Sequence, residues 1–221
     1  MANSDITFEF EKPCKRLRSL VPEVYNEVTL DIVKIFNYSS ALICQLNNCT
    51  SRKLHPYSFS WNMALEYSYA NPYQHRRIGP YPNLAAEEFR PKLGSIEIRH
   101  PPTGRHGPSF ACLYGQFKMG SSDSKYYLNS PKADADYRHI ALYKDTYQDR
   151  LEYFHQCLNN LLLILYSNSC YNTVVFPKYI GSGMARGNWE DYKTMLYNFS
   201  HQLKLHRPEV QIFIVSKPSS V

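Results

Sequence analysis

A unit of strand, glycine-rich loop, helix and strand near the carboxyl end restricts the fold of this chain more than any other feature. The run 173–177 (TVVFP) has the β-branched, apolar composition of a buried strand. The loop 178–188 follows with three glycines, apolar residues then recur at helical spacing across 189–203, and a last strand is predicted at 211–215. A helix that crosses over between two parallel strands packs on a face of their sheet. The chain is therefore predicted to be an α/β protein.

The rest of the chain fits this architecture. Helices are predicted at 59–69, where Ser58 or Ser60 can cap the first turn, and from 146 to 165, where six apolar residues form one face. Four further segments have the composition of strands, and the last two are expected to pair with each other; the segments are 27–36, 40–46, 94–99 and 109–114.

Length and composition predict one domain with tails. A chain of 221 residues with 43% hydrophobic residues can bury a sizeable core. Four prolines interrupt regular structure in one long loop, and a polar, tyrosine-rich stretch resembles a surface insertion. The predicted division is a basic tail at 1–24, a domain at 25–217 that contains the loop 71–92 and the insertion 118–145, and a tail at 218–221.

Charge and cysteine content narrow the class of partner. The net charge of +6 favours an anionic partner, and both a phosphate-bearing ligand and a nucleic acid remain open. The six cysteines form no CxxC pair, so we expect reduced thiols, no metal site and no cofactor. No segment approaches the roughly 20 apolar residues of a membrane span, so we expect no membrane partner and a cytoplasmic or nuclear protein. The basic run 12–18 is either a nuclear address or a solvated tail.

The glycine-rich loop predicts an anion site. Glycines allow close approach to the backbone, and amides at the start of a helix favour negative charge, so a diphosphate suits this position. The spacing lacks the Gly-Lys-Ser/Thr of a Walker loop and follows a late strand instead of opening a first βαβ unit. The predicted ligand-binding residues in the loop are Gly181, Ser182, Gly183, Met184, Ala185, Arg186, Gly187 and Asn188.

Four segments together resemble the macrodomain family. Residues 174–190 (VVFPKYIGSGMARGNWE) are similar to the macrodomain segment "PxxIGCGLAGGDWE", most of all in the branch of ADP-ribose 1''-phosphate phosphatases and terminal ADP-ribose glycohydrolases. Residues 28–32 (VTLDI) resemble the "xxGDI" strand end, and Asn48-Cys49 stands where the family has "VNC" or "VNA". Residues 113–117 (LYGQF), with Gly120, are similar to the "FGQxxxG" segment of phage-like members. The matches follow the family's order across 27–215.

The resemblance implies a fold, a ligand and roles. The fold would be a three-layer α/β/α macrodomain with a mixed central sheet, and the ligand would be ADP-ribose or a derivative. Asp31 would accept a hydrogen bond from the adenine amino group, with the backbone of Ile32 beside it. Asn48 would lie near the distal ribose, and the amides of 182–186 would surround the diphosphate.

Departures from the family leave the activity open. Leu30 replaces a glycine, Ser182 a cysteine and Asn188 an aspartate, while Ala185 stands where protein glycohydrolases of this branch use an aspartate. His55 is the first candidate for acid–base catalysis, with Asn48 holding the ligand.

Three groups of functions remain open. The first is an enzyme that removes phosphate from ADP-ribose 1''-phosphate. The second is a non-catalytic reader of ADP-ribose or ADP-ribosylated protein, or else an ADP-ribosyl-protein hydrolase. The third is a basic RNA- or poly(ADP-ribose)-binding protein that uses 12–18, 75–77 and Arg99.

Overall fold

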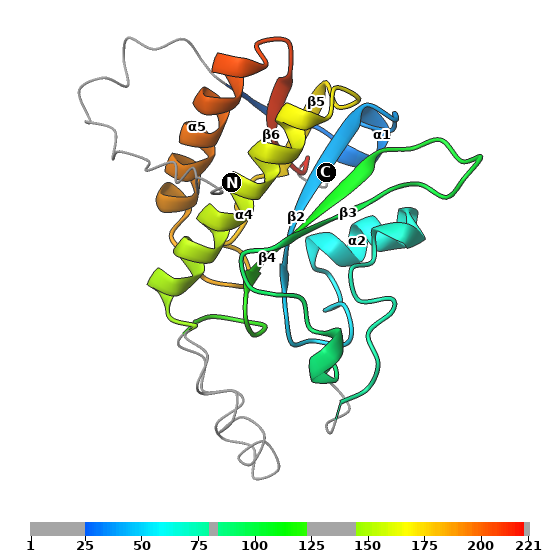
Figure 1. Ribbon diagram of the computed structural model, residues 1–221, viewed down its shortest axis with the longest axis vertical. Coiled ribbons are helices and arrows are strands. Elements are labelled where there is room, and N and C mark those ends of the chain that lie inside the picture. Colours follow the sequence, from blue (N-terminus) through cyan, green and yellow to red (C-terminus); the bar gives the residue numbers. More distant parts are fainter. Residues whose placement is uncertain (1–24, 80–83, 123–144, 219–221) are drawn as a thin grey trace, which may run out of the picture.

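A single six-stranded sheet forms the centre of the computed structural model, which describes residues 25–79, 84–122 and 145–218. The strand order is β1-β6-β5-β2-β4-β3; β3 runs antiparallel to β4, and the other neighbours are parallel (Figure 1). The elements are β1 (Asn26–Thr29), α1 (Ile32–Ile35), β2 (Ala41–Asn48), α2 (Phe59–Glu66), η2 (Ser68–Ala70), η3 (Glu87–Phe89), β3 (Ile96–Arg99), β4 (Ser109–Gln116), α4 (Tyr147–Ser167), β5 (Thr173–Pro177), α5 (Trp189–His206) and β6 (Gln211–Ser216).

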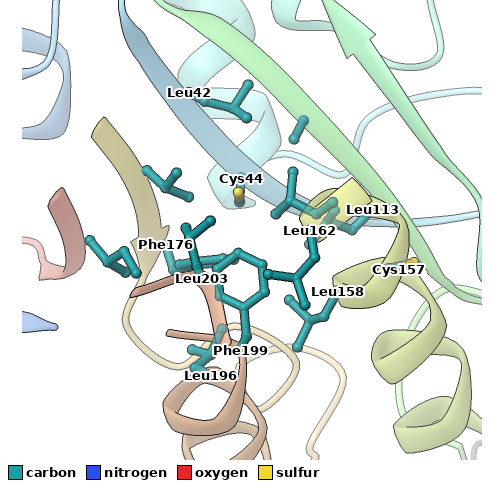
Figure 2. Close-up of a cluster of buried hydrophobic side chains, with 14 of the residues drawn as sticks. Leu42, Cys44, Leu113, Cys157, Leu158, Leu162, Phe176, Leu196, Phe199 and Leu203 are labelled. Atoms are coloured by element: carbon teal, nitrogen blue, oxygen red, sulfur yellow. The ribbon is translucent and has the colours of Figure 1, made fainter. Parts of the chain in front are cut away.

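The two long helices α4 and α5 pack on one face of the sheet. Leu42 and Cys44 of β2 contact the apolar faces of these helices in the main core, where Figure 2 shows Leu158, Leu162 and Phe199 gathered against the strands. Each of these strand residues is fully buried. The spacing of apolar residues across 146–165 therefore predicted both the helix and the face that it buries.

The short helices α1 and α2 cover the opposite face. Ala41 and Ile43, which alternate with Leu42 and Cys44 along β2, pack there with Phe36 in a second core. Successive strand residues point to opposite faces, so a strand buried on both sides is apolar throughout. The result is the expected three-layer α/β/α arrangement around a mixed sheet.

A buried ion pair joins the end of β4 to the start of α4. Arg150, only 1% exposed, donates from Nε and Nη2 to the two carboxylate oxygens of Asp145 at 2.9 and 2.7 Å. The carboxylate also accepts the backbone N–H of Phe117, and Nη1 of Arg150 donates to the carbonyl of Gly120. These bonds fix the backbone on both sides of the predicted insertion, most of which lies outside the described residues.

The segment 27–36 differs from the prediction. β1 ends at Thr29, and Asp31 caps a helical turn by accepting the N–H of Val33 at 3.1 Å. A single turn is too short to show helical periodicity, so its apolar residues resembled a continuation of the strand. The helix predicted at 59–69 ends at Glu66 and gives way to the 3₁₀ turn η2.

The other predicted elements are confirmed. Ser58 caps α2, and Thr146 with Asp149 forms a capping box at α4. The five cysteines in the described ranges are unpaired thiols. Among the helices of the described ranges, none combines the length and apolar character that a membrane crossing requires.

Candidate functional site

The predicted site residues that come together lie at the carboxyl ends of β2, β4 and β5. A cleft of about 70 Å³ opens there, and its lining includes Asn47, Asn48, His55, Gln116, Met184 and Ala185. Carboxyl ends of parallel strands are where open α/β sheets bind ligands. This volume can enclose a terminal group of a ligand, whereas a whole dinucleotide requires several hundred Å³. The remainder of such a ligand has to lie outside the enclosed part.

One wall of the cleft is held by the buried side chain of Arg76. Its guanidinium donates three hydrogen bonds to backbone carbonyls: Nη2 to Asn48 at 3.0 Å, and Nη1 to Cys49 at 2.9 Å and to Ser51 at 2.6 Å. It also lies over the ring of Tyr73, 4.2 Å from the centroid. No carboxylate within the described ranges pairs with this cation, which is 8% exposed. Arg76 therefore orders the β2–α2 loop and adds positive charge beneath the cleft.

Asn48 has a structural role in this wall. Its Oδ1 accepts the N–H of Ser51 at 2.7 Å, and both its backbone N–H and its Nδ2 donate to the Tyr73 hydroxyl at 3.2 Å. Burial raises the pKa of Tyr73, so this hydroxyl stays neutral. Asn48 lies in the cleft as predicted, but much of its hydrogen-bonding capacity is used in holding the loop.

Asn47, which the sequence analysis did not select, has capacity to spare. Its side chain is 2% exposed, and Nδ2 donates to the Ser60 hydroxyl at 2.9 Å. Its Oδ1 is buried without a hydrogen-bond partner. An unpaired polar atom in a cleft is a place where a ligand group can bind.

His55 lies at the exposed side of the cleft. Its Nδ1 is 2.7 Å from the carbonyl oxygen of Pro56, an acceptor only, so Nδ1 carries the hydrogen. In the neutral ring, Nε2 then has a free lone pair and can accept a proton. The next residue, Tyr57, is 90% exposed and has a positive φ of 66°, which L-residues rarely adopt.

The glycines of the β5–α5 loop are required by packing. A Cβ on Gly181 would lie 2.1 Å from the Tyr192 ring, and one on Gly187 would lie 2.5 Å from the Gly181 carbonyl oxygen. Gly181 also has a φ of 77°. By contrast, a Cβ on Gly183 meets nothing closer than 4.0 Å. Two of the three glycines thus let the loop fold closely over Tyr192, and that alone explains them.

Most predicted anion-binding amides of this loop are already bonded within it. Ser182 and Gly183 donate to the Tyr179 carbonyl, Arg186 to Gly183 and Gly187 to Gly181. The amides of Met184 and Ala185, both of which line the cleft, have no acceptor among the described residues. Among the loop residues that line the cleft, these two amides are therefore available to an anion.

Polar groups at the start of α5 also have hydrogen-bond partners within the protein. Asn188 caps the helix by accepting the N–H of Glu190 at 3.2 Å, and Asp191 accepts from both Asn188 Nδ2 and the Tyr147 hydroxyl. The two acidic residues of the first turn complement the helix dipole. The helix terminus therefore contributes less to an anion site than the sequence suggested.

Asp31 and Ile32 lie apart from the enclosed cleft. Asp31 caps α1, its side chain is 46% exposed, and its Oδ2 lies 3.8 Å from Lys34 Nζ. Ile32 is buried in the core beneath α1. Because β1 is parallel to β6 and β5, Asp31 follows a strand end at the same edge of the sheet as the β5–α5 loop.

The residues of the predicted nucleic-acid surface are largely committed elsewhere. Arg76 is buried as described, and Arg99 donates to the Tyr69 carbonyl at 2.6 Å and pairs with Glu97 at 2.6 Å. The basic run 12–18 lies outside the described residues. Of the 75–77 cluster, His75 and Arg77 are exposed.

The charge of the groups in and around the cleft is neutral to positive. No acidic residue is present in its lining as far as the described residues show. No group of three or more His, Cys, Asp or Glu side chains in those ranges is placed to hold a metal ion. Neutral polar groups and a buried cation suit an anionic or hydroxyl-bearing ligand.

Comparison with known proteins places the fold. Nothing among the known sequence families or the curated proteins matches the chain. The macrodomain of Mycobacterium tuberculosis DarG aligns with 87% of this chain and 98% of its own at 16% identity and a TM-score of 0.52. A Bacteroides thetaiotaomicron protein aligns over 87% and 99% at 16% identity and a TM-score of 0.47. A mutant macrodomain of Oceanobacillus iheyensis with ADPR aligns over 86% and 83% at 12% identity and a TM-score of 0.40. On the first of these alignments and the strand order, the chain has the macrodomain fold.

Proposed function

We propose that this protein binds ADP-ribose or a phosphorylated derivative of it, with the distal end of the ligand in the cleft. The observation that carries the proposal is the unpaired, buried oxygen of Asn47, which shares the cleft with the free amides of Met184 and Ala185. The amide oxygen can accept a ribose hydroxyl, and the two N–H groups can donate to a phosphate oxygen. The motif resemblance supports the same ligand, with Asp31 at the adenine.

Calorimetric titration with ADP-ribose tests binding. The unmodified protein should bind saturably, and Asn47→Ala should bind about tenfold more weakly, the loss of one good hydrogen bond to the ligand. Asn62→Ala, an exposed position on α2, is the control and should bind normally. Asp31→Asn keeps a residue that caps helices well and removes the charge, so it separates ligand contact from folding of α1. Absence of saturable binding to the unmodified protein would refute the proposal.

Phosphate hydrolysis is the second candidate, and the orientation of His55 favours it. With Nδ1–H donated to Pro56, Nε2 can take a proton from water as the water oxygen bonds to phosphorus. The bond between phosphorus and the 1'' oxygen then breaks, and that oxygen leaves with the electron pair and receives the proton that His55 Nε2 took from the water. The Met184 and Ala185 amides are placed to hold the phosphate oxygens during this step.

Release of inorganic phosphate from ADP-ribose 1''-phosphate tests this activity. His55→Ala should lose turnover by about a hundredfold or more while its affinity for ADP-ribose changes little. Binding without phosphate release by the unmodified protein would identify a reader instead. Release of ADP-ribose from an ADP-ribosylated protein would identify a protein hydrolase, although no acidic residue lines the described part of the cleft to act in it.

A further inference from the structure

A second and larger cavity lies beside the cleft. Its volume is about 500 Å³, within the range of sites for small molecules. Its lining comes from the segment 87–93, from α4 and from the ends of β2 and β4; we call it the η3–α4 cavity. Cys49 and Phe117 line it, whereas the preceding residues, Asn48 and Gln116, line the cleft. The two spaces are neighbours on the same strand ends but have different walls.

Hydrogen bonds between the walls preform this cavity. Cys49 N–H donates to the Gln116 carbonyl at 2.9 Å, and Thr50 N–H donates to that of Phe117 at 3.1 Å. Ala85 N–H donates to the Thr50 carbonyl at 2.8 Å, and Arg90 Nε donates to the Ala85 carbonyl at 2.9 Å. The segment that carries η3 is thus tied to the sheet, and the cavity does not depend on a rearrangement to exist.

The chemistry of the lining is divided between apolar and cationic groups. Phe117 and Cys49 are buried, and the half-buried ring of Tyr153 adds a further aromatic wall. Arg90 and Lys92 bring two cations against the single carboxylate of Glu87. The two terminal nitrogens of Arg90 have no partner within the described ranges. A planar group can lie against the rings while the cations bind an anionic substituent.

We propose that the η3–α4 cavity is a second ligand site, which binds a planar heteroaromatic group bearing a phosphate, as in a nucleoside monophosphate. Arg90 and Lys92 bind the phosphate, and the apolar wall holds the base. Gln156 Nε2 donates to Glu152 at 3.1 Å, so the amide oxygen of this exposed side chain is the group that can meet a donor on the edge of the base. The site is separate from the one proposed for ADP-ribose and does not depend on it.

Titration with uridine 5'-monophosphate tests the second site. This probe lacks adenine, so it does not imitate the adenosine end of ADP-ribose. Binding should persist in the presence of saturating ADP-ribose, and uridine and inorganic phosphate should each bind at least about tenfold more weakly than the complete nucleotide. Amide resonances of 87–90, 92–93 and 153–156 should shift upon binding, while those of 47–48 and 184–185 should not.

A matched pair of charge reversals completes the test. Lys92→Glu should weaken binding of the nucleotide about tenfold or more, because an exposed cation of the lining becomes an anion. Arg105→Glu makes the same charge change at an exposed turn before β4, at the opposite edge of the sheet, and should alter affinity less than about twofold. Failure to bind the nucleotide, displacement of the nucleotide by ADP-ribose, or equal effects of both reversals would overturn the proposal.

Discussion

The two sides of the cleft are built on different principles. We call them the glycine side, formed by the β5–α5 loop, and the polar side, formed by the end of β2 and the β2–α2 loop. The β5–α5 loop is shaped by glycines that fit over Tyr192, and most of its amides are bonded to its own carbonyls. The β2–α2 loop has no glycine, and the buried side chain of Arg76 orders it. At the end of β2, the buried amide of Asn47 is left with spare hydrogen-bonding capacity. The glycine motif therefore indicates the shape of the backbone in this loop. Most of the groups that a ligand could contact are buried polar side chains on the polar side of the cleft.

Replacement of Arg76 should have the largest effect on the free energy of unfolding, and it changes only the polar side of the cleft. Arg76→Ala leaves three carbonyls without their donor, and we expect a loss of about 4 kcal/mol in the free energy of unfolding, measured with urea. Arg77→Ala removes an exposed neighbour 5.3 Å from the Phe89 ring and should cost about 0.5 kcal/mol. Arg76→Lys keeps the charge without the planar fork and should lie between them. Similar stability of all three would contradict the assigned role of Arg76.

On the glycine side, the effect of replacing a glycine on stability should depend on the space for a Cβ at that position and not on the loss of a glycine as such. Gly181→Ala places a Cβ against Tyr192 at a positive φ, so we expect a loss of about 3 kcal/mol in unfolding free energy. Gly183→Ala fills open space and should change stability by less than about 0.5 kcal/mol. Thermal or urea unfolding of the two variants measures the difference. If Gly183→Ala were the more damaging, the glycines would serve a purpose other than packing.

Sequence periodicity was sufficient for most of the fold. Long elements such as α4, α5 and β4 repeat their apolar pattern often enough to be recognised, and β5 is a compact β-branched run. The helical turn α1 was missed because four residues cannot show a period, and Asp31 alone marked its start. Local pattern thus predicted the elements whose length exceeds one or two repeats.

The site was predicted less completely for a physical reason. Asn48, His55, Met184 and Ala185 were selected and do meet in the cleft. Asn47 and Arg76 were not selected as parts of it, since their roles arise from contacts with distant residues, up to 28 positions away for Arg76. Two adjacent asparagines at the end of an apolar run were the one available signal for Asn47.

The thiol of Cys49 is almost fully buried, although this residue contributes to the wall of the η3–α4 cavity. Burial raises the pKa of Cys49 to about 12, so the folded protein holds the thiol neutral when the unfolded chain, with a pKa near 8.5, begins to ionise. This contribution to stability is complete below about pH 8.5 and is lost progressively as the pH rises toward 12. At pH 9.5 the loss is about 1.4 kcal/mol.

Comparison with a variant isolates that titration from those of the other buried thiols. Between pH 7.5 and 9.5, Cys49→Ala should lose about 1.4 kcal/mol less unfolding free energy than the unmodified protein. Equal losses would mean that the Cys49 thiolate is solvated in the folded state. The exposed thiol of Cys170 provides a check, because alkylation of the native protein should modify it well before Cys49.

The smallest expected effect tests whether the start of α5, on the glycine side of the cleft, contributes to ligand binding. Asn188→Ala frees the N–H of Glu190 and should cost about 1 kcal/mol of unfolding free energy, while Asn188→Ser restores a capping hydroxyl and should recover most of it. The affinity for ADP-ribose, measured by calorimetry, should be the same in both variants, because the proposed anion contacts are the Met184 and Ala185 amides and not the N–H groups at the start of α5. A change of more than about fivefold in Asn188→Ala alone, equivalent to about 1 kcal/mol, would place the anion at the helix start. Both sides of the cleft would then contact the ligand. The contrast between a loop that only shapes the cleft and side chains that bind the ligand would no longer hold.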